Sequence, residues 1–317
     1  MLIQVLLLII GFIILIKGAD IFVDGASSIA GNLKVSKMLI GLTIVAFGTS
    51  APELAVSIKS IISNNHDIVL GNVIGSNILN ILLILGVSSL FHSLNVKDNT
   101  VKKELPITLL ITTLFAVLLS DNLYDKTMNN AFTRSDGIII ILFFSVFIYY
   151  LISIMKNKKE DNSKEEYLPM LKAITYTILG IIMIVLGSNF VVDSSKNIAL
   201  SLGVSQKLIS LTIIALGTSL PELVTSVMAT KKGEYDIAIG NVVGSNIFNI
   251  GVVIGLPITL FGGINQINFN LVDIIVMVIS AFMLFFFASN DKKITKREGV
   301  IFLILFVAYY SYVIYLG

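Results

Sequence analysis

Residues 40–57 read IGLTIVAFGTSAPELAVS and residues 209–226 read ISLTIIALGTSLPELVTS, so 12 of 18 positions are identical at an offset of 169 residues. The same offset places GNVIGSNILNI at 71–81 over GNVVGSNIFNI at 240–250, with 9 of 11 positions identical. It also pairs Gly18 with Gly187. The two halves of the chain are therefore copies of each other, and each copy carries the same two polar motifs in apolar surroundings.

The composition places both copies in a lipid bilayer. Of the 317 residues, 56% are hydrophobic and only 13% are charged, whereas about 25% are charged in a typical soluble domain. Because each copy has five apolar stretches, an odd number, we expect the second copy to enter the membrane from the opposite face. We predict an all-α integral membrane protein in which ten transmembrane helices form two inverted five-helix repeats. Its spans, each near the roughly 20 residues that cross a bilayer, are 2–29, 38–62, 68–91, 105–121, 135–155, 170–197, 206–230, 236–261, 271–289 and 298–316.

The basic residues predict the orientation. Sixteen Lys and Arg lie in or at the span ends beside the connections between spans 1 and 2, 3 and 4, 5 and 6, 7 and 8, and 9 and 10, and only five lie in or beside the other connections. The richer side is cytoplasmic by the positive-inside rule. We therefore expect a first repeat at 1–155, a cytoplasmic linker at 156–168, a second repeat at 169–317, and both termini outside the cell. The first apolar run has no basic segment before it, so we expect a retained span and not a cleaved signal peptide.

Several classes of function are excluded. The chain has no Cys, which removes disulfides and thiolate chemistry, and neither His66 nor His92 has a His partner at metal-ligand spacing. No GxxxxGK loop for nucleotide phosphates is present. A net charge of +2 gives no reason to expect a nucleic-acid partner.

The duplicated motifs place carboxylates inside the membrane. An unpaired carboxylate near the bilayer centre costs several kcal/mol, and spans 2, 3, 7 and 8 hold no Lys or Arg near Glu53 and Glu222. Both therefore need an external cation, a proton, or each in turn. Their all-oxygen surroundings suit Ca²⁺ and Na⁺ better than soft metals. The polar residues that share helix faces within these motifs are Thr49, Ser50, Ser57, Asn72, Ser76 and Asn80, and in the second copy Thr218, Ser219, Ser226, Asn241, Ser245 and Asn249.

The prolines of the two motifs are expected to break their helices. Proline lacks a backbone donor and clashes with the carbonyl four residues earlier. Pro52 would free the carbonyl of Gly48, and Pro221 that of Gly217. Such carbonyls can bind ions where a broken helix lines a cavity.

These motifs resemble the paired α-repeats of the Na⁺/Ca²⁺ exchangers in the calcium/cation antiporter superfamily, and the chain length, ten spans and short central loop resemble its prokaryotic members. The resemblance implies Na⁺/Ca²⁺ antiport by alternating access across a prokaryotic plasma membrane, with spans 1 and 6 as a long, tilted pair that slides. It implies Glu53 and Glu222 as the Ca²⁺ carboxylates, aided by Thr49 and Thr218, with Na⁺ sites at Ser50, Ser76, Ser219 and Ser245. It also implies the backbone carbonyls of Ala46 and Ala215 as ligands, which differ from the carbonyls freed by proline. Asn80 fits the family pattern, whereas some relatives have Asp at the position of Asn249.

Three other functions compete with this interpretation. H⁺/Ca²⁺ antiport on the same scaffold is the nearest, and the serines favour Na⁺ over it. A cation channel fits two broken-helix repeats less well than alternating access does, and an intramembrane hydrolase lacks both GxSxG and HExxH. We expect no enzymatic activity and no cofactor, Na⁺ and Ca²⁺ as the transported ions, electrogenic Ca²⁺ extrusion and a monomer.

The charge bias yields the first testable prediction. A cysteine introduced by Asn162→Cys, in a chain without other cysteines, should react only with reagents on the cytoplasmic side. Labelling of intact cells with a membrane-impermeant maleimide, before and after permeabilisation, measures this. Labelling of unpermeabilised cells would show the opposite orientation.

Overall fold

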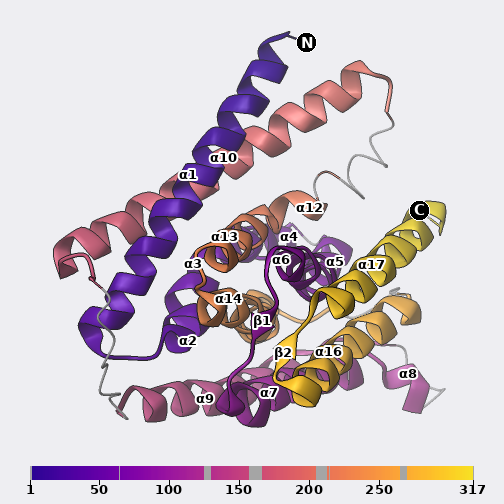
Figure 1. Ribbon diagram of the computed structural model, residues 1–317. Coiled ribbons are helices and arrows are strands. Elements are labelled where there is room, and N and C mark those ends of the chain that lie inside the picture. Colours follow the sequence, from indigo (N-terminus) through magenta and orange to yellow (C-terminus); the bar gives the residue numbers. More distant parts are fainter. Residues whose placement is uncertain are drawn as a thin grey trace.

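The protein is almost entirely helical in its computed structural model, which describes residues 2–63, 65–124, 130–156, 166–204, 213, 215–264 and 270–316 (Figure 1). Short π-helical turns, labelled η, interrupt several α-helices. The first copy contains α1 (Leu2–Leu33), α2 (Lys37–Ile40), η1 (Gly41–Val45), α3 (Ala46–Thr49), α4 (Ala51–Ile62), α5 (His66–Leu79), η2 (Asn80–Leu85), α6 (Gly86–Phe91), β1 (Leu94–Asn95), η3 (Thr100–Glu104), α7 (Leu105–Leu118), α8 (Asp121–Tyr124) and α9 (Arg134–Lys156). The second contains α10 (Met170–Ser201), α12 (Ala215–Thr218), α13 (Leu220–Lys231), α14 (Tyr235–Phe248), η5 (Asn249–Ile254), α15 (Gly255–Phe261), α16 (Leu271–Asp291), β2 (Lys293–Ile294) and α17 (Lys296–Leu316).

The sequence repeat is also a repeat of helix boundaries. The bounds of α4 and α13 differ by 169 residues, and so do those of α5 and α14 and of η2 and η5. Asn80 and Asn249 each begin a π-helical turn. Such turns are rare and occur often at functional sites, and here the same one occurs at the same position of both copies.

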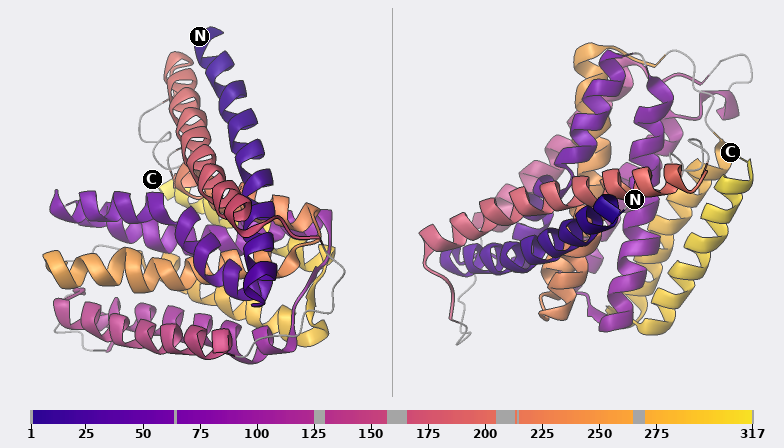
Figure 2. Two further views of the ribbon diagram at one scale, coloured as in Figure 1. Left: turned by 90° about the vertical axis from the view of Figure 1, so that its left-hand side faces the viewer. Right: turned by 90° about the horizontal axis from the view of Figure 1, so that it is seen from above.

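Helices α1 and α10, the first of each copy, pack closely and run in opposite directions. A Cβ added at Gly11 would lie 2.9 Å from Phe190 Cβ, and one added at Gly25 would lie 2.7 Å from the Thr177 nitrogen. Residues later in α1 contact residues earlier in α10, so the two equivalent helices are antiparallel. Both views in Figure 2 show the pair side by side and inclined to the other helices.

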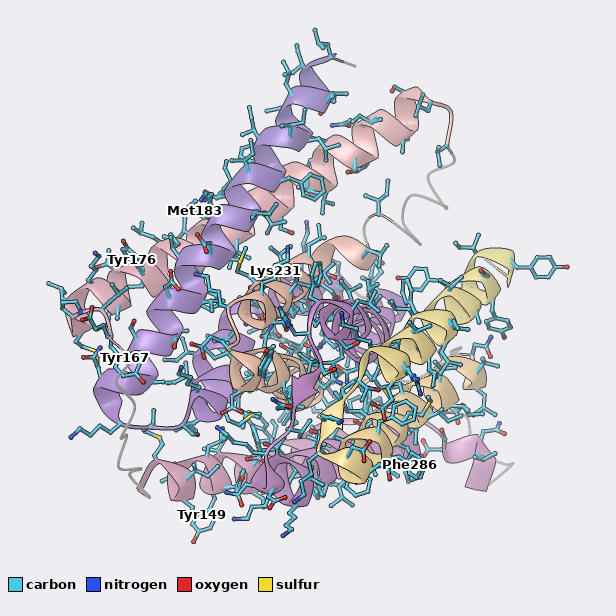
Figure 3. All side chains as sticks on the ribbon, in the orientation of Figure 1. Tyr149, Tyr167, Tyr176, Met183, Lys231 and Phe286 are labelled. Carbon is cyan, nitrogen blue, oxygen red and sulfur yellow. The ribbon has the colours of Figure 1, made fainter. Side chains whose placement is uncertain are left out.

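The outer surface has the apolar character of a membrane protein. Seven helices in the described part of the chain are long and apolar enough to cross a bilayer, and the bent pair Lys37–Thr49 and Ala51–Ile62 makes an eighth candidate. On α9, Leu142, Val146 and Tyr149 are each at least 60% exposed, and Figure 3 shows Tyr149 projecting away from the protein. The chain is therefore a multi-pass membrane protein.

Two of the ten predicted spans are not among these eight candidates. The span predicted at 105–121 corresponds to α7, which has 14 residues and continues the short turn η3. The span predicted at 206–230 begins in residues outside those that the structure describes, and so does most of the predicted linker at 156–168. The number of ten spans thus stays a prediction.

The prolines break the helices where the sequence predicts a break. The segment Lys37–Thr49 meets Ala51–Ile62 at an angle of 47°, and Ser50, between them, has φ −84° and ψ 6°. Pro52 lies in the first turn of α4, where a missing backbone donor breaks no helical bond. Ser219 and Pro221 repeat the arrangement between α12 and α13.

Four connections meet at one end of the protein and are joined by ion pairs between the copies. Lys37 Nζ lies 2.9 Å from Glu234 Oε1, and Lys232 Nζ lies 2.6 Å from Asp24 Oδ1. Lys97 pairs with Asp236. Strand β1 pairs with β2 in antiparallel fashion, Leu94 opposite Ile294. The connections predicted to share one side of the membrane therefore lie together.

The close contact between α1 and α10 generates a stability prediction. A Cβ at Gly187 would lie 2.6 Å from the nitrogen and 2.8 Å from the Cα of Leu15, so the backbone itself would have to move. We expect Gly187→Ala to destabilise the protein by about 1–3 kcal/mol, as overpacking does. The control is Ser289→Ala, because that hydroxyl bonds a carbonyl of its own helix at the exposed surface. The unfolding midpoint in detergent measures both, and equal midpoints would contradict the proposed contact.

Candidate cation-binding site

The polar motifs of both copies meet in the interior of the protein. Helix α14 packs against η1 and α3 of the other copy, and α5 packs against α12 and η5. Figure 1 shows α3, α4, α5, α13 and α14 gathered in the centre, beneath the α1–α10 pair. Nine of the polar residues predicted for the site are less than 5% exposed: Thr49, Ser50, Glu53, Ser76, Asn80, Ser219, Glu222, Ser245 and Asn249. Thr218 is half-buried. Thr218 ends α12, and Ala46 and Ala215 begin α3 and α12.

The two carboxylates face each other without a basic partner among the described ion pairs. Glu53 and Glu222 are each 1% exposed, and their charges repel each other across the site. Each lies in the first turn of the helix that follows a break. The positive end of a helix dipole favours a negative charge at that position, but it does not neutralise two of them.

Serines from the two copies contact each other across the site. Ser50 Oγ lies 3.0 Å from Ser245 Oγ and 3.0 Å from Glu222 Oε1. A hydroxyl has a single proton. Ser50 can therefore donate to the Glu222 carboxylate while its own oxygen accepts a hydrogen bond from Ser245. The equivalent pair, Ser219 and Ser76, is separated by 3.3 Å. The structure thus brings together all four serines that the sequence singled out.

Asn72 and Asn241 have structural partners. The Nδ2 of Asn241 donates to Ser226 Oγ at 2.9 Å, and its Oδ1 accepts from Thr49 Oγ1 at 3.0 Å. The Nδ2 of Asn72 donates to the Glu53 carbonyl at 3.1 Å and to Ser57 Oγ at 3.2 Å. These amides attach α5 to α4 and α14 to α13, so each holds a carboxylate-bearing helix against its neighbour.

Five buried oxygens of the site have no hydrogen-bond donor among the described residues. A carboxylate or amide oxygen can only accept, and buried polar atoms almost always find a partner. Two of the five belong to the same carboxylate. They are Glu53 Oε1, Glu53 Oε2, Glu222 Oε2, Asn80 Oδ1 and Asn249 Oδ1. Two negative charges and five available oxygens at one place fit a hard cation.

One of the carbonyls freed by proline is engaged. The Gly217 carbonyl accepts a hydrogen bond from Ser188 Oγ of α10 at 3.1 Å, and a residue outside the motif therefore satisfies it. The Ala46 carbonyl, which is not one of those freed by proline, accepts from the Ser50 nitrogen at 3.0 Å and from Thr49 Oγ1 at 3.3 Å. A carbonyl that a proline frees from its helix is therefore not always available to an ion, because another side chain can bond to it.

The sequence interpretation missed Asn77 and Asn246, which lie inside the site. Both are 1% exposed, and both belong to the GSN triplet that recurs at the offset of 169 residues. The recurrence of this triplet in both copies was the sequence signal that could have identified the two asparagines as site residues. Among the described residues no group of three or more His, Cys, Asp or Glu side chains could hold a metal ion, so a cation at this site would need neutral oxygens besides the two carboxylates.

Comparison with known proteins finds relatives over nearly the whole chain. The profile of the family described as sodium/calcium exchanger protein matches residues 3–153 and 172–315. The protein CaxA of Alkalimonas amylolytica is 37% identical, and the sodium/calcium exchanger MaX1 of Methanosarcina acetivorans is 34% identical; each alignment covers 98% of both chains. A solved structure of the sodium–calcium exchanger NCX_Mj, soaked with 10 mM Na⁺ and zero Ca²⁺, is similar with a TM-score of 0.83 at 34% identity and covers 97% of both chains.

The Ser188 contact generates a prediction about the broken helix. Ser188→Ala leaves the Gly217 carbonyl without its donor, which should lower the free energy of unfolding by about 1–3 kcal/mol. Ser145→Ala is the control, because that hydroxyl bonds a carbonyl of its own helix at the exposed surface. Unfolding midpoints in detergent compare the two, and an unchanged midpoint for Ser188→Ala would mean that the contact is dispensable.

Proposed function

The chain belongs to the sodium/calcium exchanger family, and we propose that it is a secondary antiporter that exchanges Na⁺ for Ca²⁺ by alternating access. The observation that carries this proposal is the set of five buried acceptor oxygens on Glu53, Glu222, Asn80 and Asn249. Burial of two like charges is unfavourable unless a cation accompanies them. A divalent cation neutralises both, so Ca²⁺ suits this centre as a substrate. Transport, and not catalysis, follows from the family.

The ligand set proposed for Ca²⁺ combines both copies. Glu53 and Glu222 supply charge, Asn80 and Asn249 supply amide oxygens, and Thr49 and Thr218 assist. The Na⁺ ions use the flanking serine pairs, Ser50 with Ser245 and Ser219 with Ser76, whose short contacts support this assignment. The backbone carbonyls of Ala46 and Ala215 complete the set.

The proposed architecture has ten spans in two inverted repeats, residues 1–155 and 169–317, joined by a cytoplasmic linker at 156–168. The antiparallel packing of α1 against α10 supports the inversion. The end that carries the inter-copy ion pairs is cytoplasmic, since the Lys- and Arg-rich connections gather there. We place the protein in a prokaryotic plasma membrane, as a monomer with both termini outside.

Exchange is proposed to be electrogenic. Bound Ca²⁺ brings a site with two carboxylates to about zero net charge, whereas about three Na⁺ would leave it near +1. An inside-negative membrane potential then drives Na⁺ entry and Ca²⁺ extrusion.

The deciding experiment is ⁴⁵Ca²⁺ uptake into proteoliposomes under an imposed Na⁺ gradient and, separately, under an imposed pH gradient. Uptake driven by outward Na⁺ flow supports the proposal. Uptake driven by the pH gradient alone would favour H⁺/Ca²⁺ exchange on the same scaffold.

The paired carboxylates generate a mutational prediction. Glu53→Gln and Glu222→Gln should each reduce Na⁺-driven Ca²⁺ uptake by about 100-fold or more, because each removes a charge that the ion needs. Both proteins should fold, since each variant also relieves a buried charge. Glu104→Gln is the matched control: Glu104 is 2% exposed and accepts a hydrogen bond from Tyr150 away from the site. Near-normal uptake by either site variant would refute the ligand assignment.

A further inference from the structure

Asn77 and Asn246 face each other between the two copies. The Nδ2 of Asn77 lies 3.4 Å from the Asn246 carbonyl oxygen, and the Nδ2 of Asn246 lies 3.5 Å from the Asn77 carbonyl oxygen. The two residues occupy equivalent positions of the repeat. Each amide is therefore directed at the backbone of the other copy.

These backbone contacts fix which way each amide points. A backbone carbonyl can only accept a hydrogen bond, so the NH₂ group of the facing amide must be turned toward it. The Oδ1 atoms of Asn77 and Asn246 are then turned the other way. A flipped Asn77 would place oxygen against oxygen at the Asn246 carbonyl.

The fixed oxygens in turn orient the second pair of amides. Asn77 Oδ1 accepts from Asn249 Nδ2 at 3.0 Å, and Asn246 Oδ1 accepts from Asn80 Nδ2 at 2.9 Å. Because Asn80 and Asn249 use their NH₂ groups in these bonds, their own Oδ1 atoms point away from them. Those two oxygens are the buried ones without a donor in the described chain.

We propose that Asn77 and Asn246 are positioning residues, which hold the Asn249 and Asn80 amides with oxygen, not nitrogen, toward the transported cation. The proposal rests on the ion site proposed above. The arrangement is reciprocal: Asn77 of the first copy orients the Asn249 amide of the second, and Asn246 of the second copy orients the Asn80 amide of the first. A released amide could turn its NH₂ group to the ion, and that group bears partial positive charge and no free lone pair.

The pairing of Asn77 with Asn249, and of Asn246 with Asn80, allows a test that distinguishes positioning from simple packing. Asp in place of Asn249 presents oxygen whichever way it is turned, so its orientation no longer matters. Asn77→Ala should raise the Ca²⁺ dissociation constant about tenfold in the natural chain and less than about twofold in the Asn249→Asp background, a coupling that a double-mutant cycle isolates. Equilibrium ⁴⁵Ca²⁺ binding to purified protein measures it without relying on transport.

The Asn80→Asp background is the matched control, because Asn80 is the amide that Asn77 does not orient. In Asn80→Asp the Asn249 amide is still oriented by Asn77, so Asn77→Ala should again cost about tenfold. The mirror cycle exchanges the roles: Asn246→Ala should be rescued by Asn80→Asp and not by Asn249→Asp. If the alanine variants do not fold, Asn77→Ser and Asn246→Ser enter the same cycles, since a serine hydroxyl is too short to replace the amide contact.

The outcomes separate the two proposals. Equal losses of affinity in both backgrounds would overturn the positioning role and leave Ca²⁺ binding intact in the natural chain. No Ca²⁺ binding by the natural chain would overturn the proposed function itself. Rescue by the crossed carboxylate alone supports the positioning role.

Discussion

Two carboxylates buried in a membrane protein without a basic partner are the constraint on which the rest of this structure depends. Glu53 and Glu222 repel each other, and the described ion pairs lie at an end of the molecule, not beside them. Such a pair is unfavourable unless a cation or a proton offsets its charge. In the proposed exchanger, the helix breaks, the serine pairs, Asn80 and Asn249 arrange oxygen around that charge.

The proposed inversion of the repeat would explain how the two copies of one motif can meet in a single site. Each carboxylate lies at the start of a helix after a break, and each amide begins a π-helical turn. Polar contacts join unlike motifs of different copies, as between Thr49 and Asn241, and also like motifs, as between Ser50 and Glu222. In the proposed site neither copy is sufficient alone, because each provides one carboxylate and one amide oxygen.

The sequence predicts much of the fold because the repeat offset, the apolar spans and the prolines are local features. It predicts less well which polar residue on a helix face meets the ion. Asn72 and Asn80 lie on one face of the same span, but Asn72 bonds a neighbouring helix while Asn80 keeps a free oxygen. The contacts of Ser188 and Asn77 depend on where another helix packs, which spacing along the chain does not encode.

Similar limits apply to the glycines at GxxxG spacing. A Cβ at Gly240 or Gly244 would lie within 3.0 Å of the other copy, at Gly41 and Ala46. These two glycines let α14 approach η1 and α3 closely. The GxxxG spacing indicates such a packing surface but does not say which helix it contacts.

The ion pairs at one end carry a thermodynamic consequence. In the proposed alternating-access cycle, two identical inverted copies would give the two access states equal free energies, since a two-fold rotation would convert one state into the other. At the positions equivalent to Glu234, Lys232 and Lys97 the chain has Asn65, Ser63 and Gln266, so the opposite end cannot form the same pairs. An exposed ion pair contributes about 1 kcal/mol or less, and any pair that forms in only one access state shifts the balance between the states by that amount. In the proposed cycle, the connecting loops can therefore set the resting ratio of the two states separately from the affinity of the ion site.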